Sequence, residues 1–243
     1  MQAGGRFFFE YQKDLAVLLP QDAHHAVKVL RKKVGDKILL IDGKGKEFEG
    51  EIIEINYKKR TPEVKARIIS LLRTEKSIKP YLIALIPLLK KENTELIVEK
   101  GTELGVSCFI PFISQHTVAK KDERFVERLK KKSAEALKQS GRLILPEIKE
   151  IKKLEEFLRG SIDGKLVVGV PEGKIKGFEE LLSLKKHEKV YLLTGPEGGF
   201  SKEEESLIDE LNPIKVSLGR YILKAETASI VIMGIFSFIC YNF

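Results

Sequence analysis

The fold of this chain is most clearly marked by residues 192–204, which read LLTGPEGGFSKEE. This pattern indicates an apolar strand that ends in a glycine-rich loop, followed at once by a helix. Ser201 and Glu204 have the spacing of a capping box, in which each side chain bonds a backbone N–H of the other residue. The glycines would let the main chain approach a ligand closely. Because the loop lacks the spacings of a P-loop or a dinucleotide-binding motif, it is, taken alone, equally compatible with an ordinary tight turn.

A second glycine turn is expected within residues 217–228, which read SLGRYILKAETA. Here an apolar strand ends at Gly219, and charged groups flank a short apolar stretch before the last helix. Glu226 and Thr227 could simply begin that helix, where the helix dipole favours a carboxylate. Two such turns at neighbouring strand ends would, however, enclose a crevice at the carboxyl edge of a parallel sheet. Open α/β folds bind their ligands in that position.

The segments around these turns predict an α/β domain over residues 73–243. Apolar strands are expected in five places, at 81–88, 106–112, 166–170, 190–194 and 214–218. Helices are expected at 94–104 and 123–140, and each is followed by a glycine, Gly105 or Gly141. Fully apolar strands that alternate with helices indicate right-handed parallel βαβ units. The polar residues 73–80 would link this domain to the preceding part of the chain.

Residues 1–72 predict a small β-barrel, because short strands dominate this part of the chain. The strands are expected at 7–9, 38–41, 48–55 and 64–72. Asp42-Gly43 followed by Gly45 is a hairpin signal, since such turns need residues with positive φ. One short helix is expected at 22–32, with Ala26, Val29 and Leu30 directed toward the core.

The charge balance does not by itself identify a partner. There are 43 lysines and arginines against 35 acidic residues, which gives a formal net charge of +8. Such a surplus suits a phosphate-bearing partner, because each neutralised phosphate releases counterions. A solvated surface explains the same numbers equally well, since the acidic count is also high. The 43% of apolar residues excludes a disordered chain.

The cysteines and the chain ends favour a cytoplasmic protein without a membrane span. Cys108 and Cys240 lie in apolar runs, as buried reduced thiols do, and residues 1–10 lack the pattern of a signal peptide. Residues 228–243 carry no charge but are shorter than the roughly 20 residues that a spanning helix needs. A buried C-terminal helix is the better prediction, with room for packing against a second subunit. His24 and His25 have no partners at metal-ligand spacing, so no metal site is expected.

The two glycine turns and several shorter motifs together resemble the SPOUT methyltransferases, and most closely the ribosomal RNA small subunit methyltransferase E family. The resemblance covers nearly the whole chain. Its further motifs occur in the family's order and comprise Arg6-Phe7-Phe8, His25 to Arg31, Lys90, Lys100 with Glu103 to Val106, Pro111, Gln139 to Arg142 and Pro146 to Ile148.

This resemblance implies a fold, a cofactor and a reaction. The fold would combine a PUA-like β-barrel at 1–72 with a SPOUT domain at 73–243 that carries a trefoil knot and forms a homodimer. The reaction would methylate N3 of one uridine in 16S ribosomal RNA of the small subunit, with S-adenosylmethionine as methyl donor. The residues expected to hold the cofactor are Val170, Pro171, Gly195, Pro196, Glu197, Gly198, Gly199, Leu218, Gly219 and Leu223.

Four residues of the second turn are the expected catalytic groups. N3 of uridine must lose its proton to become nucleophilic, and Lys224 and Arg220 would stabilise the resulting anion. Glu226 would orient a basic side chain or the target, and Thr227 would bond the substrate. The family usually has arginine where this chain has Lys224 and often where it has Tyr221, and Asn93 and His116 replace residues that are often basic in relatives. The residues expected to bind RNA are Lys28, Arg31, Lys90, Gln139 and Arg142.

Two other functions are compatible with the sequence. One is a SPOUT enzyme that acts on transfer RNA or on a different base, which the substitutions at Tyr221 and Lys224 leave open. The other is an RNA-binding protein without catalytic activity, in which the α/β domain serves only for dimerisation. Binding of S-adenosylmethionine would distinguish the second from an enzyme.

Overall fold

The computed structural model describes residues 5–57, 61–77, 79–118, 124–171, 182–184 and 188–242. They belong to two compact units. The first comprises Met1–Ser77 with Leu137–Leu145, and the second comprises Ile78–Ala136 with Pro146–Phe243. The boundary expected from the sequence, between residues 72 and 73, falls inside the last strand of the first unit.

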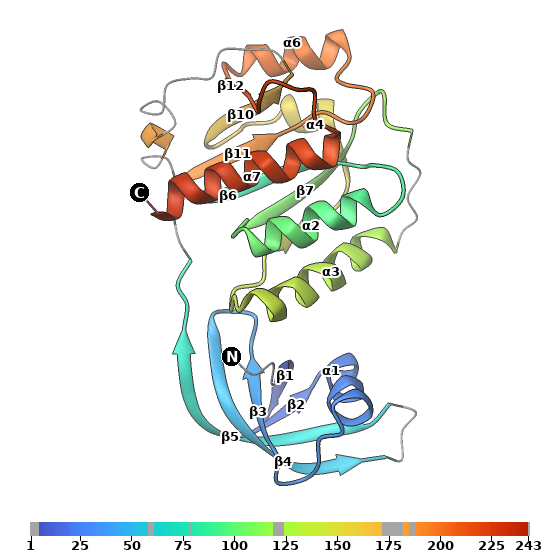
Figure 1. The fold of residues 1–243 in the computed structure, drawn as a ribbon, viewed down its shortest axis with the longest axis vertical. Coiled ribbons are helices and arrows are strands. Elements are labelled where there is room, and N and C mark those ends of the chain that lie inside the picture. The colour runs from blue at the N-terminus through green and yellow to red at the C-terminus, as the bar shows by residue number, and fades with distance from the viewer. Residues whose placement is uncertain are drawn as a thin grey trace. The chain divides into compact units, whose positions relative to one another are not determined.

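The first unit is built on a closed five-stranded barrel, which confirms the prediction (Figure 1). β1 and β3 pair in parallel to close the barrel, and the other neighbours are antiparallel. The predicted hairpin joins β3 to β4 through Gly43 and Gly45, whose φ angles are 68° and 109°. Of the five strands, only the second was not predicted: β1 (Arg6–Gln12), β2 (Leu15–Leu18), β3 (Lys37–Ile41), β4 (Lys46–Asn56) and β5 (Glu63–Thr74).

The helical segment of the first unit differs from the prediction in its bounds and in its buried face. It consists of α1 (Pro20–His24) and a π-helical turn, η1 (His25–Val29). Val29 and Leu30, which were expected to face the core, are exposed, whereas Ala26 and Val27 are buried. The reason is the wider π turn, closed by the bond from Leu30 N to His25 O, which shifts the last residues off the period of an ordinary helix.

The second unit contains the predicted parallel sheet. Its strand order is β12-β10-β11-β6-β7-β8, with β9 also paired to β7, and every pair is parallel. The five predicted strands are present, and the two-residue strands β8 and β9 were not predicted. The bounds are β6 (Tyr81–Pro87), β7 (Cys108–Ile113), β8 (Glu147–Ile148), β9 (Lys152–Lys153), β10 (Lys165–Val170), β11 (Lys189–Leu193) and β12 (Ile214–Ser217).

Helices cover both faces of this sheet (Figure 1). Residues of α2 (Asn93–Glu103), α3 (Phe125–Ser140) and α7 (Ala225–Asn242) pack on one face, and residues of α4 (Leu154–Leu158) and α6 (Lys202–Glu210) pack on the other. Successive residues of β6, β10 and β11 therefore enter opposite cores, which explains why these strands are almost entirely apolar. The predicted C-terminal helix is confirmed as α7, and both cysteines are free, Cys108 half-buried and Cys240 buried.

Candidate functional site

A pocket of about 820 Å³ lies at the carboxyl ends of β6, β10, β11 and β12 in the second unit. The two glycine turns that the sequence predicted to meet there both line it. A volume of this size suits a nucleoside-sized ligand. Its lining residues come from the strand ends, from the segments that follow the four strands and from the first turns of α2, α6 and α7. They include Lys90, Lys91, Asn93, Gly169, Val170, Pro171, Thr194, Gly195, Leu218, Gly219, Tyr221, Lys224 and Glu226.

The loop between β11 and α6, here called the glycine loop (residues 194–201), forms one wall. Its main chain turns back on itself through a bond from Gly199 N to Pro196 O of 3.0 Å, and Gly199 has a φ of 72°. The predicted capping box ends the loop: Ser201 Oγ accepts from Glu204 N, and Glu204 Oε2 accepts from Ser201 N. The loop therefore begins and ends in fixed positions on β11 and α6.

The residues after β12, here called the second loop (residues 218–224), form the facing wall. Gly219 has a φ of 145°, a conformation that favours glycine. Leu218 packs against the end of β10 so closely that a Cβ on Gly169 would lie 3.1 Å from Leu218 Cδ1 and from Thr194 Cγ2. Gly169 thus leaves space between the strand end and both loops.

A hydroxyl pair connects the glycine loop to α7. Thr194 Oγ1 and Ser229 Oγ are 2.6 Å apart, and both residues are buried. Ser229 Oγ donates to Ala225 O at 2.9 Å, so Thr194 is the donor in the bond between the two hydroxyls. The bond fixes the first turn of α7, and with it Lys224 and Glu226, relative to the glycine loop.

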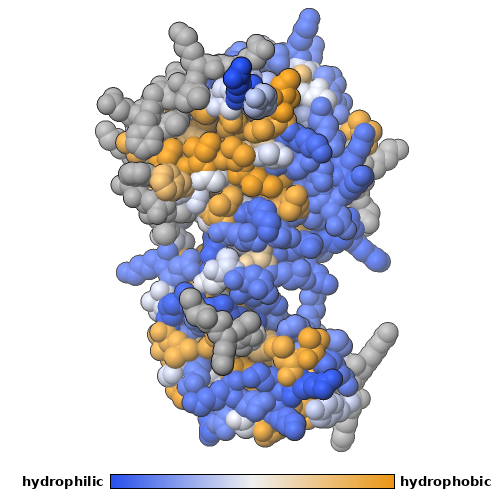
Figure 2. Space-filling view, in the orientation of Figure 1, coloured by the Kyte–Doolittle hydropathy of each residue, from blue (hydrophilic) through white to orange (hydrophobic). Residues whose placement is uncertain are grey.

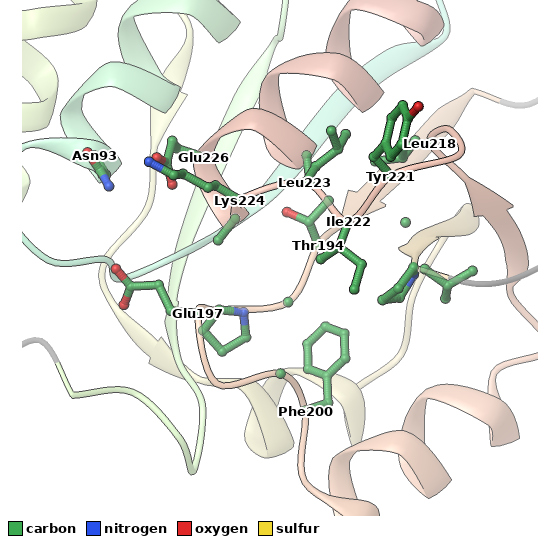
Figure 3. A pocket seen from close by; sticks show the side chains of 18 of the residues that line it. Asn93, Thr194, Glu197, Phe200, Leu218, Tyr221, Ile222, Leu223, Lys224 and Glu226 are labelled. Atoms are coloured by element: carbon green, nitrogen blue, oxygen red, sulfur yellow. The ribbon is translucent and has the colours of Figure 1, made fainter.

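The pocket has a polar end and an apolar end. Figure 3 shows Asn93, Glu197, Lys224 and Glu226 at one end, and Leu218, Tyr221, Ile222 and Leu223 toward the other. Thr194 and Phe200 lie between them. A ligand with an apolar ring at one end and charged groups at the other would match this division.

Most of the residues expected to hold a cofactor do line the pocket. They are Val170, Pro171, Gly195, Pro196, Glu197, Gly199, Leu218, Gly219 and Leu223. Gly198 is not among the lining residues; a Cβ there would lie 2.9 Å from His116 Cβ. Of the expected catalytic residues, Lys224 and Glu226 line the pocket, whereas Arg220 and Thr227 are exposed outside it.

The residues expected to bind RNA divide between the two units. Lys90 lines the pocket in the second unit. Lys28 and Arg31 belong to the barrel unit, where Lys28 Nζ lies 5.9 Å from the centre of the Tyr57 ring and Arg31 has a φ of 56°. Gln139 and Arg142 belong to the same unit, because Leu137–Leu145 packs with the barrel.

Several lining residues were missed by sequence reasoning. Gly169, Thr194 and Phe200 were not proposed as site residues, nor were Asn93 and Lys91. An isolated glycine inside a strand pattern signals a close approach of the backbone, so Gly169 could have been found. Asn93 and Lys91 carry no comparable local signal.

Among the residues that the structure describes, no group of three or more His, Cys, Asp or Glu side chains could hold a metal ion. None of the described helices combines the length and the apolar character that crossing a bilayer requires.

Comparisons with known proteins point to one family. A family model for the RNA methyltransferase domain matches residues 76–237, and a model for the RNA methyltransferase PUA domain matches residues 18–60. The chain is 30% identical over 251 residues to Ribosomal RNA small subunit methyltransferase E of Bacillus subtilis, with 96% of each protein covered. It is 31% identical over 190 residues to the protein of that name from Aquifex aeolicus, covering 77% of this chain and 81% of the relative.

Solved structures agree with this result. A Legionella pneumophila structure in complex with the bound cofactor S-adenosylmethionine is 29% identical, with a TM-score of 0.82 and coverage of 95% of this chain and 96% of the other. A Neisseria gonorrhoeae Ribosomal RNA small subunit methyltransferase E, also bound to S-adenosylmethionine, has a TM-score of 0.81 over 96% of this chain and 97% of the other. At 23% identity, the second structure establishes the likeness of fold.

Proposed function

Because this chain belongs to the ribosomal RNA small subunit methyltransferase E family, we propose that it methylates N3 of one uridine in 16S ribosomal RNA. It is a ribosomal RNA methyltransferase that uses S-adenosylmethionine. The observation that carries the proposal is the meeting of the two glycine turns in one pocket, within the segment that the methyltransferase model matches.

The residues of the pocket fit the cofactor. Gly169, Gly195 and Gly219 leave room beside the main chain, and a Cβ on Gly169 would crowd Leu218 and Thr194. The apolar end, with Val170, Leu218 and Leu223, would hold the adenine ring. The polar end would hold the charged amino-acid part. When bound, S-adenosylmethionine supplies a methyl group on a positively charged sulfur.

The chain's own task is to prepare and hold the uridine. N3 carries a proton, so the base must become an anion before it can attack. The Lys224 ammonium, at the polar end of the pocket, would stabilise that anion at the uracil carbonyl oxygens. Glu226, in the first turn of α7, would orient Lys224 or the base. Arg220 and Thr227, exposed beside the pocket, would contact the RNA outside it.

The RNA would be held by both units. Lys28 and Arg31 on the barrel, Gln139 and Arg142 in the segment that packs with it, and Lys90 at the pocket would contact phosphates or bases. A target base inside a helix would have to leave its stack before it could enter the pocket.

We further propose the oligomeric state and the knot of the SPOUT enzymes for this chain. Two copies would pair through the largely apolar helix α7, on which Phe238 is 55% exposed. Figure 2 shows an apolar patch over α7 on the visible face of the second unit. The C-terminal segment would form a trefoil knot, and the protein would act in the cytoplasm, where its ribosomal RNA substrate is found.

A labelling experiment tests the function. The protein would be incubated with radiolabelled S-adenosylmethionine and with separated RNA pools from a strain that lacks it, and the modified nucleotide would then be mapped. We expect label in 16S ribosomal RNA, at N3 of a uridine. Label confined to transfer RNA, or on another atom, would contradict the proposed target.

A further inference from the structure

Glu204 is a buried carboxylate that joins two distant parts of the second unit. It is 1% exposed and occupies the first turn of α6. Its Oε2 accepts from Ser201 N and from Ser114 Oγ, each at 2.9 Å, and its Oε1 accepts from Gln115 N at 3.0 Å. Two of these three donors come from the turn after β7 and have no part in the capping box.

That turn, here called the support turn (residues 114–117), is closed by its own hydrogen bonds. Thr117 N donates to Ser114 O at 3.0 Å, and Ser114 N donates to Thr117 Oγ1 at 2.9 Å. Ser114 is 4% exposed. The support turn is therefore a fixed partner for the carboxylate of Glu204.

The support turn also contacts the middle of the glycine loop. His116 Nδ1 lies 3.1 Å from Gly198 O, and it is the donor because a carbonyl oxygen can only accept. The two residues are in close contact, since a Cβ on Gly198 would lie 2.9 Å from His116 Cβ. The glycine loop is thus held at Gly198 by His116 and at Ser201 by Glu204.

These contacts use residues that do not line the pocket. Gly195, Pro196 and Glu197 line it, whereas Gly198 and Glu204 do not. A carboxylate suits this role because it only accepts, and three donors converge on its two oxygens. The N-terminal end of α6 favours its negative charge. An amide of the same size would direct an NH₂ group at one of the donors.

We propose that Glu204 is a positioning residue for methyl transfer: through Ser114 and Gln115 it holds the glycine loop in the shape that binds the cofactor. The proposal rests on the function proposed above, because it takes the pocket as the S-adenosylmethionine site. If Glu204 were only a helix cap, its bond to Ser201 would be sufficient, and its bonds to the support turn would not affect the pocket.

The test uses three variants: Glu204→Gln, Ser114→Ala and the double variant that combines the two. The control is Glu203→Gln, which removes an exposed carboxylate from the same helix turn. Calorimetry would give the Kd for S-adenosylmethionine, and kinetics would give the KM for each substrate. We expect Glu204→Gln to raise the Kd and the KM for S-adenosylmethionine at least about tenfold, with the KM for RNA unchanged within about twofold. Glu203→Gln should match the wild type.

The double variant separates positioning from capping. If Ser114 acts through Glu204, the double variant should bind S-adenosylmethionine about as weakly as Glu204→Gln alone. Ser114→Ala alone should weaken binding about threefold or more, which keeps the test decisive if Glu204→Gln does not fold. Unchanged affinity in Ser114→Ala, or effects that multiply in the double variant, would overturn the positioning role. A wild type that does not bind S-adenosylmethionine would instead contradict the proposed function.

Discussion

Lys224 and Glu226 lie together at the polar end of the pocket, at the junction of the second loop and α7. Their backbone is held in place by hydrogen bonds in the first turns of α7. Thr194 and Ser229 fix the first turn of α7, and Ala228 N donates to Lys224 O at 2.8 Å. The flexible side chain of Lys224 is thereby attached to a fixed backbone position. A group that stabilises a charge developing on the substrate needs such a fixed position.

Replacing Lys224 should impair catalysis more than cofactor binding. In Lys224→Ala we expect kcat to fall by about 10²-fold or more, because the cation proposed to stabilise the uridine anion is lost. The Kd for S-adenosylmethionine should stay within about threefold, and Lys224→Arg should retain much of the activity. The control is Lys215→Ala, an exposed lysine of β12 that pairs with Asp209. An unchanged kcat in Lys224→Ala would remove this residue from the mechanism.

Cys108 should resist alkylation at neutral pH. Burial, with a smaller contribution from Glu147, raises the pKa of its thiol to about 11. Only about one thiol in a thousand is then ionised at pH 8, against roughly a quarter for a free cysteine with a pKa of about 8.5. Iodoacetamide labelling followed by mass spectrometry should show slow reaction of Cys108 at pH 8 and a rising rate toward pH 11. Fast labelling at pH 7 would contradict this pKa.

At the scale of single residues, the sequence predicted the residues that line the pocket better than the residues that pack behind them. Gly195, Gly199 and Gly219 belong to motifs that mark turns, and all three line the pocket. Gly198 belongs to the same motif but packs against His116 from another strand's loop, a contact that no local pattern indicates. Side chains that pack behind a site come from distant parts of the sequence, so their contacts become apparent only in the folded structure.

The segment Leu137–Leu145 belongs to the barrel unit and is bonded to two of its arginines. Arg6 Nη1 donates to Lys138 O at 3.2 Å, and Arg73 Nη2 donates to Gly141 O at 2.7 Å. Glu47 lies between the arginines, with Oε1 2.6 Å from Arg6 Nε and Oε2 3.1 Å from Arg73 Nε. The cluster secures the segment that carries Gln139 and Arg142.

Removing the carboxylate at the centre of this cluster should weaken the barrel unit. The Glu47 side chain is 8% exposed, so Glu47→Ala would leave both arginines without their shared partner. We expect the free energy of unfolding to fall by about 2 kcal/mol, less than for a fully buried pair because Arg73 is partly exposed. Glu54→Ala, on the same strand and paired with Lys65 at the surface, should cost less than about 1 kcal/mol. Urea denaturation of both variants measures the difference, and equal costs would contradict this role for Glu47.

Elements with a strong local signal were predicted, and those without one were not. The capping box of α6 and the glycines after α2 and α3 appear as expected. β8 and β9 have two residues each, too few for a pattern to emerge, and they exist only because β7 offers an edge to pair with. The π-helical turn after α1 could not be predicted, because apolar periodicity indicates only the ordinary helix of about 3.6 residues per turn.

At the scale of the whole molecule, the sequence pattern changes from short strands to apolar strands that alternate with helices. This change predicted a β-barrel followed by an α/β domain. The assignment of Leu137–Leu145 to the barrel unit was not predictable in that way. It depends on contacts between residues far apart in sequence, such as the bond of 2.6 Å from Leu143 N to Glu75 Oε2. The trefoil knot and the homodimer follow from the family resemblance alone and stay predictions.

The homodimer has a direct test on α7. Phe238 is 55% exposed, and in a dimer through this helix a charge at its position would be buried without a partner. We expect the wild type to sediment as a dimer and Phe238→Asp as a monomer, measured by analytical ultracentrifugation. Leu71→Asp, an exposed apolar residue of the barrel strand β5, should leave the dimer intact. A dimeric Phe238→Asp variant would place the interface elsewhere.

The central claim is that the glycine loop and the second loop together enclose one molecule of S-adenosylmethionine. The most direct measurement is a crystal structure of the protein grown with that cofactor. The predicted result is ligand density in contact with Gly169 to Pro171, with the glycine loop and with Leu218 to Leu223. Ligand density outside this pocket, or in contact with only one of the two loops, would contradict the claim.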